Sequence, residues 1–584
     1  MRAFSDLPQS LLLLLLTTAS GLALPYQPWE LAGQAVLTPA SSGRHGAVAC
    51  ESKVCSQIGI DLLARGGNAV DAFVGTQLCV GVIGMYHSGL GGGGFALIRD
   101  ANQEYTVIDY RESAPAAAFE DMYSGNVKGS VFGGLAAGVP GELRGLEFAH
   151  KSFGALPWHS VVEPAARVAH DGFAVTQDTV RYMEAGVRAA GWNFLVEDPS
   201  WAQDFAPNGS LLTVGETMYR KRYAETLRKV AEKGADVFYT GEIAEATIAT
   251  LQAYNGTMTL DDLAEYEVIT REPVNITYRE FNVYSAGAPT SGAVSLSALK
   301  TMEGYDAADT ADVNLTLHRF DEAMRFAYGA RQELGDPAFV KGAAQLEEHL
   351  LDPRRAASTR ARILDNATQP VENYAAGGLY TTPGRGTSHI STADGAGMAV
   401  SSTTTINLLF GNLLMVPSTG VVLNNEMNDF SIPGAPNEFG FEPAPANFVR
   451  PGKRPLSSIT PLIATRRPDR GPGGGSRLVV VVGAAGGSRI VSATTQVAWH
   501  VLEHGNSMQE AIAAKRLHDQ LMPNTAVFEA GFDEDMVESM AAKGHNVTWI
   551  PLAASAVQGI RVGADGRFEA ASENRQLASG GLAL

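Results

Sequence analysis

The chain has 584 residues, of which 45% are hydrophobic and 18% are charged. This length exceeds the size at which one hydrophobic core stops growing, so it allows one large domain or several, and the composition is ordinary for a folded, soluble protein. The formal net charge is −18 at pH 7. Nucleic acids and anionic membrane surfaces are therefore disfavoured as partners, because both bind concentrated Lys and Arg.

Residues 1–23 are predicted to be a signal peptide that is not part of the fold. Arg2 gives a weak positive start, an apolar run begins at Ser10, and Gly21-Leu22-Ala23 offers the small residues that a signal peptidase reads. The apolar run is about 15 residues long, shorter than the roughly 20 needed to span a bilayer. This length favours a cleaved signal over an uncleaved membrane anchor.

Sequons and cysteines agree with the secretory pathway. Six Asn-X-Ser/Thr sequons are predicted glycosylation sites: Asn208, Asn255, Asn275, Asn314, Asn366 and Asn546. Only three cysteines occur, Cys50, Cys55 and Cys79, so the fold is not a disulfide scaffold. In an oxidising compartment two of them can pair and one remains. We expect a secreted, extracellular, cell-surface or vacuolar protein.

From Glu51 to Ile83 the sequence predicts two helices, joined at Arg65-Gly66-Gly67-Asn68. The string HSGLGGGGFALIRD follows, in which FALIRD is a predicted strand. Gly89, Gly91 and Gly94 match the dinucleotide pattern G-x-G-x-x-G, but that motif needs a strand before it and a helix after it. Because the order is reversed here, we interpret these glycines as positions where backbones pack closely.

Residues 140–270 and 312–365 have helical periodicity. After Thr387 the pattern changes: TSHISTA and GMAVSSTTTINLLF are predicted strands joined by the hairpin signal Asp394-Gly395, and VVLNN and SRLVVVVGAAGG are predicted as further strands. Helices are predicted at 488–504 and 507–517, and RRPDRGPGGGS is expected to be a loop between strands. No internal repeat or clear linker divides the sequence.

Neither the hydrolase motif G-x-S-x-G nor a Walker loop occurs in the sequence. His500-Val-Leu-Glu-His504 does match the zinc-peptidase pattern H-x-x-E-H, which places both histidines one helical turn apart. The pattern is short, and Gly505 indicates that His504 lies at a helix C-terminus, where an imidazole interacts favourably with the helix dipole. A zinc peptidase that uses His500, Glu503 and His504 remains an alternative hypothesis.

The stretch YTTPGRGTSHIST suggests different chemistry, because Gly386 precedes Thr387 at the start of a predicted strand. A threonine hydroxyl is a poor nucleophile without a nearby base, and one solution uses the threonine's own α-amine, which requires that the preceding peptide bond be cut. The same hydroxyl can make that cut by attacking the preceding carbonyl, which a glycine leaves unhindered. Gly-Thr alone is weak evidence, since most such pairs only begin strands.

Further strings in a fixed order strengthen this interpretation. They run from about Gly46 to about Ser572 and include GNAVDA, VIDYRESAP, PGELRG, LPW, RFAYGAR, GDPAFV, STTTINLLFGN, NNEMNDF, KRPLSSITP and VVGAAGGSRI. Together they closely resemble the γ-glutamyltransferase family, also called glutathione hydrolases, of the N-terminal nucleophile hydrolase superfamily. The resemblance implies an α/β fold, specifically a four-layer αββα sandwich.

The resemblance also implies processing and a catalytic set. Autocleavage at Gly386-Thr387 would divide the chain into a large subunit, 24–386, and a small subunit, 387–584, which stay together as a heterodimer. Thr387 matches the nucleophile, and Thr405 matches the second threonine, whose hydroxyl orients it. Gly486 and Gly487 match the glycines whose backbone N–H groups form the oxyanion hole.

Six residues match the family's substrate site: Asn407, Glu426 and Asp429 for the α-amino group, and Arg111, Ser457 and Ser458 for the α-carboxylate. The chemistry agrees, because a γ-glutamyl group carries a zwitterion remote from its scissile amide and needs acids at one end and a cation with hydroxyls at the other. Without the family, Arg111-Glu112 would be interpreted as a surface ion pair, and Glu426 and Asp429 as solvated loop acids.

Some positions depart from the family. Cys55 and Cys79 match a disulfide of the animal members, whereas Cys50 is extra and a second animal disulfide has no cysteines here. Leu409 stands where animal-type sequences have a tyrosine, which leaves acceptor preference open. Asn428 replaces a more usual Asp.

The implied reaction cleaves the γ-glutamyl amide of glutathione or its S-conjugates through an acyl-threonine intermediate and transfers the group to water, an amino acid or a dipeptide. Such an enzyme is an acyltransferase and threonine-type peptidase made as a zymogen, and we expect it to need no metal or other cofactor. A secreted acylase of the same family, acting on a glutaryl-cephalosporin or on poly-γ-glutamate, is one alternative. An uncleaved glycoprotein that acts only by binding is another.

Overall fold

The computed structural model describes residues 40–306, 308–374, 386–435, 443–468 and 475–584. The predicted signal segment 1–23 and most of RRPDRGPGGGS lie outside these residues, as does the loop immediately before Gly386. No helix among the described residues is long and apolar enough to cross a bilayer.

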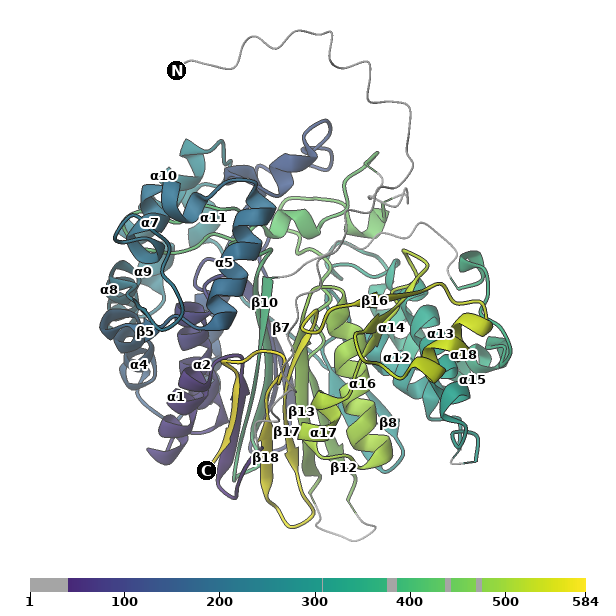
Figure 1. Cartoon of the computed structure of the whole chain (residues 1–584). Helices are drawn as coiled ribbons and strands as arrows, with labels where there is room; N and C mark the ends of the chain where they lie inside the picture. Colours follow the sequence, from purple (N-terminus) through teal and green to yellow (C-terminus); the bar gives the residue numbers. More distant parts are fainter. Residues whose placement is uncertain (1–39, 307, 375–385, 436–442, 469–474) are drawn as a thin grey trace. The chain divides into compact units, whose positions relative to one another are not determined.

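The core contains two antiparallel seven-stranded sheets, whose strands come from distant parts of the chain (Figure 1). The first sheet has the order β1 (Ser41–Gly43), β18 (Phe568–Ala571), β17 (Ala556–Val562), β13 (Arg477–Ala485), β12 (Leu462–Arg466), β9 (Phe281–Ser285) and β8 (Val274–Tyr278). The second has the order β19 (Gly580–Ala583), β2 (Gly46–Cys50), β10 (Gly386–Asp394), β11 (Ala399–Asn407), β3 (Gly93–Arg99), β4 (Tyr105–Tyr110) and β7 (Ile269–Arg271).

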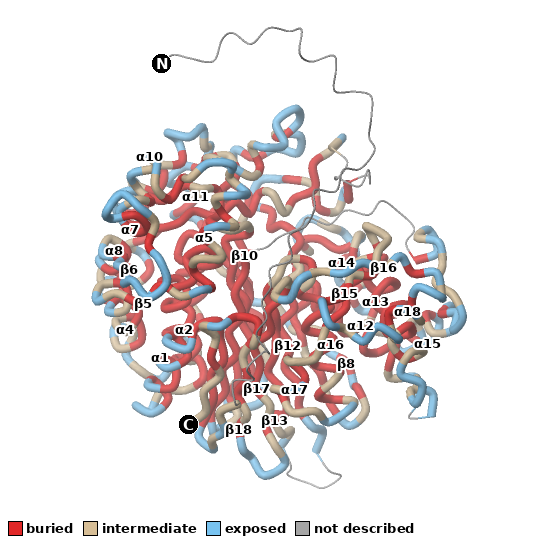
Figure 2. The backbone as a smooth tube through the Cα atoms, in the orientation of Figure 1, coloured by how far each residue is buried: buried red, intermediate tan, exposed pale blue. Residues whose placement is uncertain are grey.

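The two sheets pack face to face. Alternate residues of their strands, such as Leu97, Ile463 and Val481, form the buried cluster between them. The residues on either side of Val481 point the other way, into a cluster with the covering helices. Because both faces of these strands are buried, as Figure 2 shows in red, their sequences are nearly continuous apolar or small-residue runs.

Helices cover both outer faces and complete a mixed α/β arrangement of four layers (Figure 1). Beside the second sheet lie α1 (Lys53–Ala64), α2 (Ala69–Ile83), α3 (Glu142–Phe153), α4 (Trp158–Asp171), α5 (Gln177–Ala190), α6 (Phe194–Glu197), α7 (Pro199–Phe205), α8 (Lys221–Lys233), α9 (Asp236–Tyr239), α10 (Glu242–Ala253) and α11 (Leu260–Ala264). On the side of the first sheet are α12 (Gly292–Met302), α13 (Val313–Arg331), α14 (Ala343–Leu351), α15 (Pro353–Arg362), α16 (Arg489–His504), α17 (Met508–Ala513) and α18 (Glu534–Ala542).

Two smaller sheets lie outside the central pair. One joins β14 (Leu517–His518), β15 (Ala526–Glu529) and β16 (Val547–Ile550), and the other joins β5 (Phe173–Ala174) and β6 (Thr217–Met218).

Several sequence-based predictions are confirmed. The helix pair α1–α2 is joined as expected, with Asn68 accepting hydrogen bonds from the N–H groups of Val70 and Asp71. The hairpin at Asp394-Gly395 joins β10 to β11. The glycine run before β3 is required for close packing, because a Cβ at Gly92 would collide with the carbonyl oxygen of Thr405.

Two predicted elements are wrong. VVLNN, residues 421–425, forms isolated bridges rather than a strand. The side chain of Asn424 instead bonds the carbonyls of Gly91 and Gly138, so asparagine side chains satisfy the neighbouring backbone in place of a ladder. The helix predicted at 507–517 ends at Ala513, because Leu517 and His518 pair with β15.

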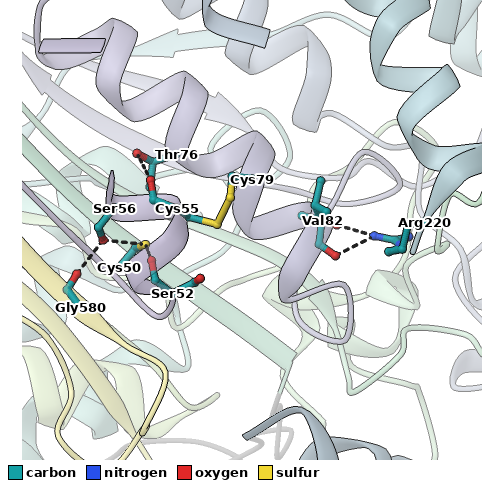
Figure 3. Close-up of a disulfide and its surroundings, with 10 residues drawn as sticks. Cys50, Ser52, Cys55, Ser56, Thr76, Cys79, Val82, Arg220 and Gly580 are labelled. Carbon is teal, nitrogen blue, oxygen red and sulfur yellow. Dashed lines mark hydrogen bonds between the residues drawn. A yellow bond between two sulfur atoms is a disulfide. The ribbon is translucent and has the colours of Figure 1, made fainter. Parts of the chain in front are cut away.

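The three cysteines lie close together around the start of α1 (Figure 3). Cys55 and Cys79 are joined by a disulfide that links α1 to α2, as expected. Cys50 is free and buried, and its Sγ atom lies 3.1 Å from the Ser56 hydroxyl. Burial raises the pKa of the Cys50 thiol to about 12, so this thiol stays protonated and unreactive at neutral pH.

Candidate active site

The predicted nucleophile and its partner face each other across the central hairpin. Thr387 pairs with Thr405, and the register shifts between Gly386 and Thr387. The Thr387 hydroxyl donates to the Thr405 hydroxyl over 3.5 Å, and the Thr405 hydroxyl donates to the Gly386 carbonyl oxygen over 2.5 Å. Thr405 therefore contacts both the attacking hydroxyl and the carbonyl that would be attacked.

This geometry suits attack on the Gly386 carbonyl. A donor on a carbonyl oxygen stabilises the negative charge that develops when the carbon is attacked. The position also requires a glycine, because a Cβ at Gly386 would lie 2.6 Å from the Asn407 carbonyl oxygen. The N–H of Asn407 donates to the Thr405 hydroxyl oxygen over 2.7 Å, which fixes the direction in which that hydroxyl points.

Thr387 opens onto a pocket lined by charged, hydroxyl and apolar residues. Nine of the ten predicted catalytic and substrate-binding residues line it: Arg111, Thr387, Thr405, Asn407, Glu426, Asp429, Ser457, Ser458 and Gly487. Five further residues complete the lining: Arg331, Leu456, Ile459, Ser488 and Ile490. The chain thus brings together positions that are separated by more than three hundred residues in the sequence.

The charged residues of the pocket are not solvated surface groups. Arg111 is 1% exposed and forms ion pairs of 2.5 Å with both Glu426 and Asp429. Glu112 lies farther away, 3.9 Å from the same guanidinium. Burial raises the pKa of Glu112 to about 7 and raises the pKa of Glu426 well above its ordinary value, although Arg111 opposes both shifts.

This pairing adds to the sequence-based picture, in which Arg111 and the two acids hold opposite ends of a zwitterion. In the structure, the Arg111 guanidinium instead lies against both acids. Charge-assisted pairs of this kind are strong in a buried site, so a zwitterionic ligand would have to exchange its own ammonium and carboxylate for these contacts.

The serines and the glycine turn lie at the other side of the pocket. Ser457 accepts from the Ile459 N–H over 3.1 Å, and Ser458 accepts from the Arg331 guanidinium over 3.2 Å. Gly486 and Gly487 connect β13 to α16 with φ values of 129° and 62°. Gly487 lines the pocket directly, next to the start of a helix, where backbone N–H groups are available to an anion.

Arg331 is the charged residue among the five pocket residues that the sequence did not predict. It ends α13, within the family string RFAYGAR, to which the resemblance assigns no role. The available signal was an arginine in a buried helix without an acidic neighbour one turn away. Leu409 and Asn428, the two departures from the family pattern, do not line the pocket among the described residues.

The residues of the alternative zinc site make other contacts. His504 ends α16 and Gly505 follows in the left-handed conformation, as expected. The Glu503 carboxylate accepts from the Tyr278 hydroxyl and pairs with Arg279 at 2.8 Å. Within the described part of the chain, His500, Glu503 and His504 do not bring their ligand atoms together as a metal site would. Two other groups do so: His318 with Glu322 and His545, and Asp321 with Asp519 and His545.

The family assignment rests on the whole chain. The family model described as gamma-glutamyltranspeptidase matches residues 55–581. The chain belongs to the gamma-glutamyltranspeptidase family. It is 48% identical to the glutathione hydrolase proenzyme of Arthroderma benhamiae, over 95% of this chain and 96% of that protein. It is 46% identical to a glutathione hydrolase of Aspergillus flavus, over 92% of this chain and 89% of the relative.

A solved structure extends the likeness to the fold. The cephalosporin acylase from Bacillus halodurans superposes with a TM-score of 0.81 at 26% sequence identity, covering 96% of this chain and 99% of that one. The α/β arrangement expected from the sequence is therefore shared with this solved structure.

Proposed function

We propose that this chain is a glutathione hydrolase, which cleaves the γ-glutamyl amide of glutathione and its S-conjugates. One observation carries the proposal: a threonine that follows a glycine opens onto a pocket that also contains Arg111, Glu426, Asp429 and two serines. A γ-glutamyl group presents a carbonyl for the threonine and a zwitterion for the charged groups. The high identity to relatives named glutathione hydrolases supports the same reaction.

The first step of the proposed mechanism is self-cleavage. The Thr387 hydroxyl attacks the Gly386 carbonyl carbon, the C–N bond breaks, and the resulting ester is hydrolysed by water. The products are a large subunit, 24–386, and a small subunit, 387–584, whose first residue carries a free α-amine. The contact from the Thr405 hydroxyl to the Gly386 carbonyl oxygen supports this step, because it stabilises the developing oxyanion.

Turnover then uses the new amine as the base for the same hydroxyl. Thr387 attacks the γ-carbonyl, the amine component leaves with a proton, and water or an amino acid or dipeptide acceptor releases the γ-glutamyl group. Backbone N–H groups at Gly486 and Gly487 are proposed to bind the oxyanion, worth about 3–4 kcal/mol per donor. Asn407, Glu426 and Asp429 would hold the donor's ammonium, and Arg111 with Ser457 and Ser458 its carboxylate.

An acylase activity is the second candidate, because the superposition with the cephalosporin acylase spans nearly the whole chain. The two functions differ in the donor's α-amino group, which a glutaryl amide lacks. Purified protein should hydrolyse γ-glutamyl-4-nitroanilide and glutathione much faster than glutaryl-4-nitroanilide. The opposite preference would replace the proposed function with the acylase, and an inactive single chain would favour a protein that acts only by binding.

Secretion and glycosylation complete the proposal. Five of the predicted glycosylation sites are exposed and Asn314 is half-buried, which is compatible with glycan attachment. Mass spectrometry of the mature protein should find a chain that begins after residue 23, a second chain that begins at Thr387, and glycans on several sequons. Retention of residues 1–23 would indicate a membrane anchor instead.

A further inference from the structure

A second buried guanidinium lies in the pocket. Arg331 is 5% exposed and lines the same space as Arg111 and Thr387. Arg111 is paired with two acids, whereas Arg331 forms no ion pair within 4.0 Å among the described residues. A buried cation without a paired anion is costly, and a bound carboxylate would offset that cost.

The contacts of Arg331 lead to the two serines of the pocket. Its Nε donates to the Ser291 hydroxyl over 2.8 Å, and its Nη2 donates to the Ser458 hydroxyl over 3.2 Å. The Ser291 hydroxyl in turn donates to the Ser457 carbonyl oxygen over 2.7 Å. Arg331 therefore contacts Ser458 directly and is linked to Ser457 through the Ser291 hydroxyl.

The direction of the bond to Ser458 matters. Because the Ser458 oxygen accepts from a guanidinium, its own hydrogen remains to be donated to another group. A hydroxyl that accepts from a cation is polarised and becomes a better donor. The natural acceptor in an enzyme for γ-glutamyl donors is the α-carboxylate.

The charges of the pocket lead to the same conclusion. Arg111 faces Glu426, Asp429 and, at 3.9 Å, Glu112, so its single charge is matched by up to three carboxyl groups. Burial lowers the pKa of Arg331, while Tyr328 and the Asp429 carboxyl group act in the opposite direction. A guanidinium stays charged at any physiological pH. Arg331 is thus the cation of the pocket whose charge is available to a bound carboxylate.

Resting on the proposed function, we propose that Arg331 is a positioning residue for the donor's α-carboxylate. It orients the Ser458 hydroxyl toward that carboxylate and supplies the positive charge that Arg111, paired with acids, does not supply alone. A purely structural role is the competing explanation, in which Arg331 only ties the end of α13 to the serine segment.

A pair of donors separates the two roles. γ-Glutamyl-4-nitroanilide carries the α-carboxylate, and 4-aminobutanoyl-4-nitroanilide is the same donor without it. For Arg331→Gln we expect kcat/KM on the first donor to fall by about tenfold or more, mainly through KM, as for loss of a hydrogen bond to a charged group. On the second donor the change should stay below about threefold. Arg331→Lys should lie between Arg331→Gln and the parent.

Two controls complete the experiment. Arg319→Gln removes an arginine of the same helix that pairs with Asp365 outside the pocket, and it should leave both donors unchanged. Ser458→Ala should reproduce the donor selectivity of Arg331→Gln, and the double variant should lose little more than either single one, because both act on the same contact. Self-cleavage should remain complete in all five variants.

An equal loss on both donors, or no loss on either, would overturn the positioning role. If Arg331→Gln does not fold, the same comparison is made with Arg331→Lys and Ser458→Ala, for which an unselective loss overturns the proposal equally. Failure of the proposed function is distinct from these results: the parent protein itself would then not cleave γ-glutamyl-4-nitroanilide.

Discussion

At the scale of single residues, Thr387 carries the most direct prediction. Thr387→Ala removes the only hydroxyl that can attack the Gly386 carbonyl from within the same peptide unit, so purified protein should run as one precursor chain on a denaturing gel. Thr387→Ser keeps a hydroxyl and should still cleave, more slowly. Normal two-chain material from Thr387→Ala would contradict the assignment of the nucleophile.

Substitution of Arg111 should weaken donor binding without impairing self-cleavage. Arg111→Lys keeps the positive charge but cannot reproduce the two parallel contacts of a planar guanidinium. The KM for γ-glutamyl donors should therefore rise by about tenfold or more, while self-cleavage, which involves no donor, stays near normal. Steady-state kinetics beside a gel of the same preparation measure both, and an unchanged KM would remove Arg111 from the donor site.

Asp429 predicts selectivity for the donor's ammonium. Asp429→Asn keeps the shape and removes one charge, so turnover of γ-glutamyl-4-nitroanilide should fall by about tenfold or more, as for loss of a charge-assisted hydrogen bond. Glutaryl-4-nitroanilide lacks the amine, and its slow hydrolysis should be unchanged or improved. Equal damage to both donors would mean that Asp429 serves the fold or the nucleophile instead.

The sequence was most informative about residues and least informative about their pairing. Nine of the residues that meet in the pocket could be predicted, because each belongs to a recognisable string. The ion pairs from Arg111 to Glu426 and Asp429 could not be predicted, because they depend on how two segments more than 300 residues apart approach each other. Arg331 was missed because an arginine in a helical string has many uses, and only its burial distinguishes it.

At the scale of elements, strands with strong alternation or long apolar runs were predictable, and short irregular segments were not. The β10–β11 hairpin follows from its turn residues and its β-branched composition. VVLNN has the composition of a strand, but its asparagines bond the backbone of neighbouring loops, which no local pattern reveals. The end of α17 was misplaced because pairing of Leu517 with β15 overrides helical periodicity.

A chain of hydrogen bonds ties α13 to the turn before β16. His318 lies on α13, and its Nε2 contacts the Leu364 carbonyl oxygen over 2.8 Å, so this nitrogen must carry a hydrogen. Its Nδ1 then accepts from His545 Nε2 over 2.8 Å. The remaining nitrogen of His545 lies 3.1 Å from Asp321. Neither atom of this last pair makes a hydrogen bond among the described residues, so the Asp321 carboxyl group is buried there without a hydrogen-bond partner.

The surroundings of Asp321 agree with a protonated carboxyl group. Burial raises its pKa to about 7, although Arg325 on the same helix opposes the shift. Burial lowers the pKa of His545 to about 4, which keeps the imidazole neutral. Arg325 is itself paired with Asp519 at 2.7 Å, and Glu322 accepts from the Tyr374 hydroxyl.

The buried Asp321 carboxyl group predicts a pH dependence of stability. Asp321 has an ordinary pKa of about 4 when unfolded and about 7 when folded, so the folded state binds the proton more tightly. The resulting stabilisation is complete below about pH 4 and is lost as the pH rises through 7. Asp321→Asn has nearly the same shape and is neutral at every pH. Relative to this variant, the wild type should lose free energy of unfolding between pH 5 and 8, on the order of 2 kcal/mol.

Urea unfolding at several pH values measures that difference. Asp365→Asn is the matched control, because the Asp365 carboxylate is partly exposed and paired with Arg319, and its pKa is lowered. The control should show no such loss above pH 5. Parallel pH profiles of the wild type and Asp321→Asn would show that burial does not raise the pKa of Asp321 in the folded protein.

At the scale of the whole molecule, the predicted cut does not divide the fold into separate parts. The strands β11 and β19, and all of β10 from Thr387 onward, lie after the predicted cut and pair with β2 and β3, which come before it. In the other sheet, β12 pairs with β9 and β18 pairs with β1 across the same boundary. Both sheets are therefore built from both predicted subunits, which share the buried cluster between the sheets.

This interleaving predicts how the cleaved protein unfolds. Neither predicted subunit can complete a sheet alone, so the two chains should elute together in native gel filtration and unfold together in urea. Because unfolding then releases two chains, mass action makes its midpoint rise with protein concentration. The uncleaved Thr387→Ala precursor has the same contacts within one chain, so its midpoint should not depend on concentration. Tryptophan fluorescence at two protein concentrations, with both proteins side by side, measures this difference.

Concentration-independent midpoints for both would mean that the subunits unfold without separating, or that the protein is never cut. A denaturing gel of the same samples distinguishes these two results, and only the second would contradict self-cleavage at Gly386-Thr387.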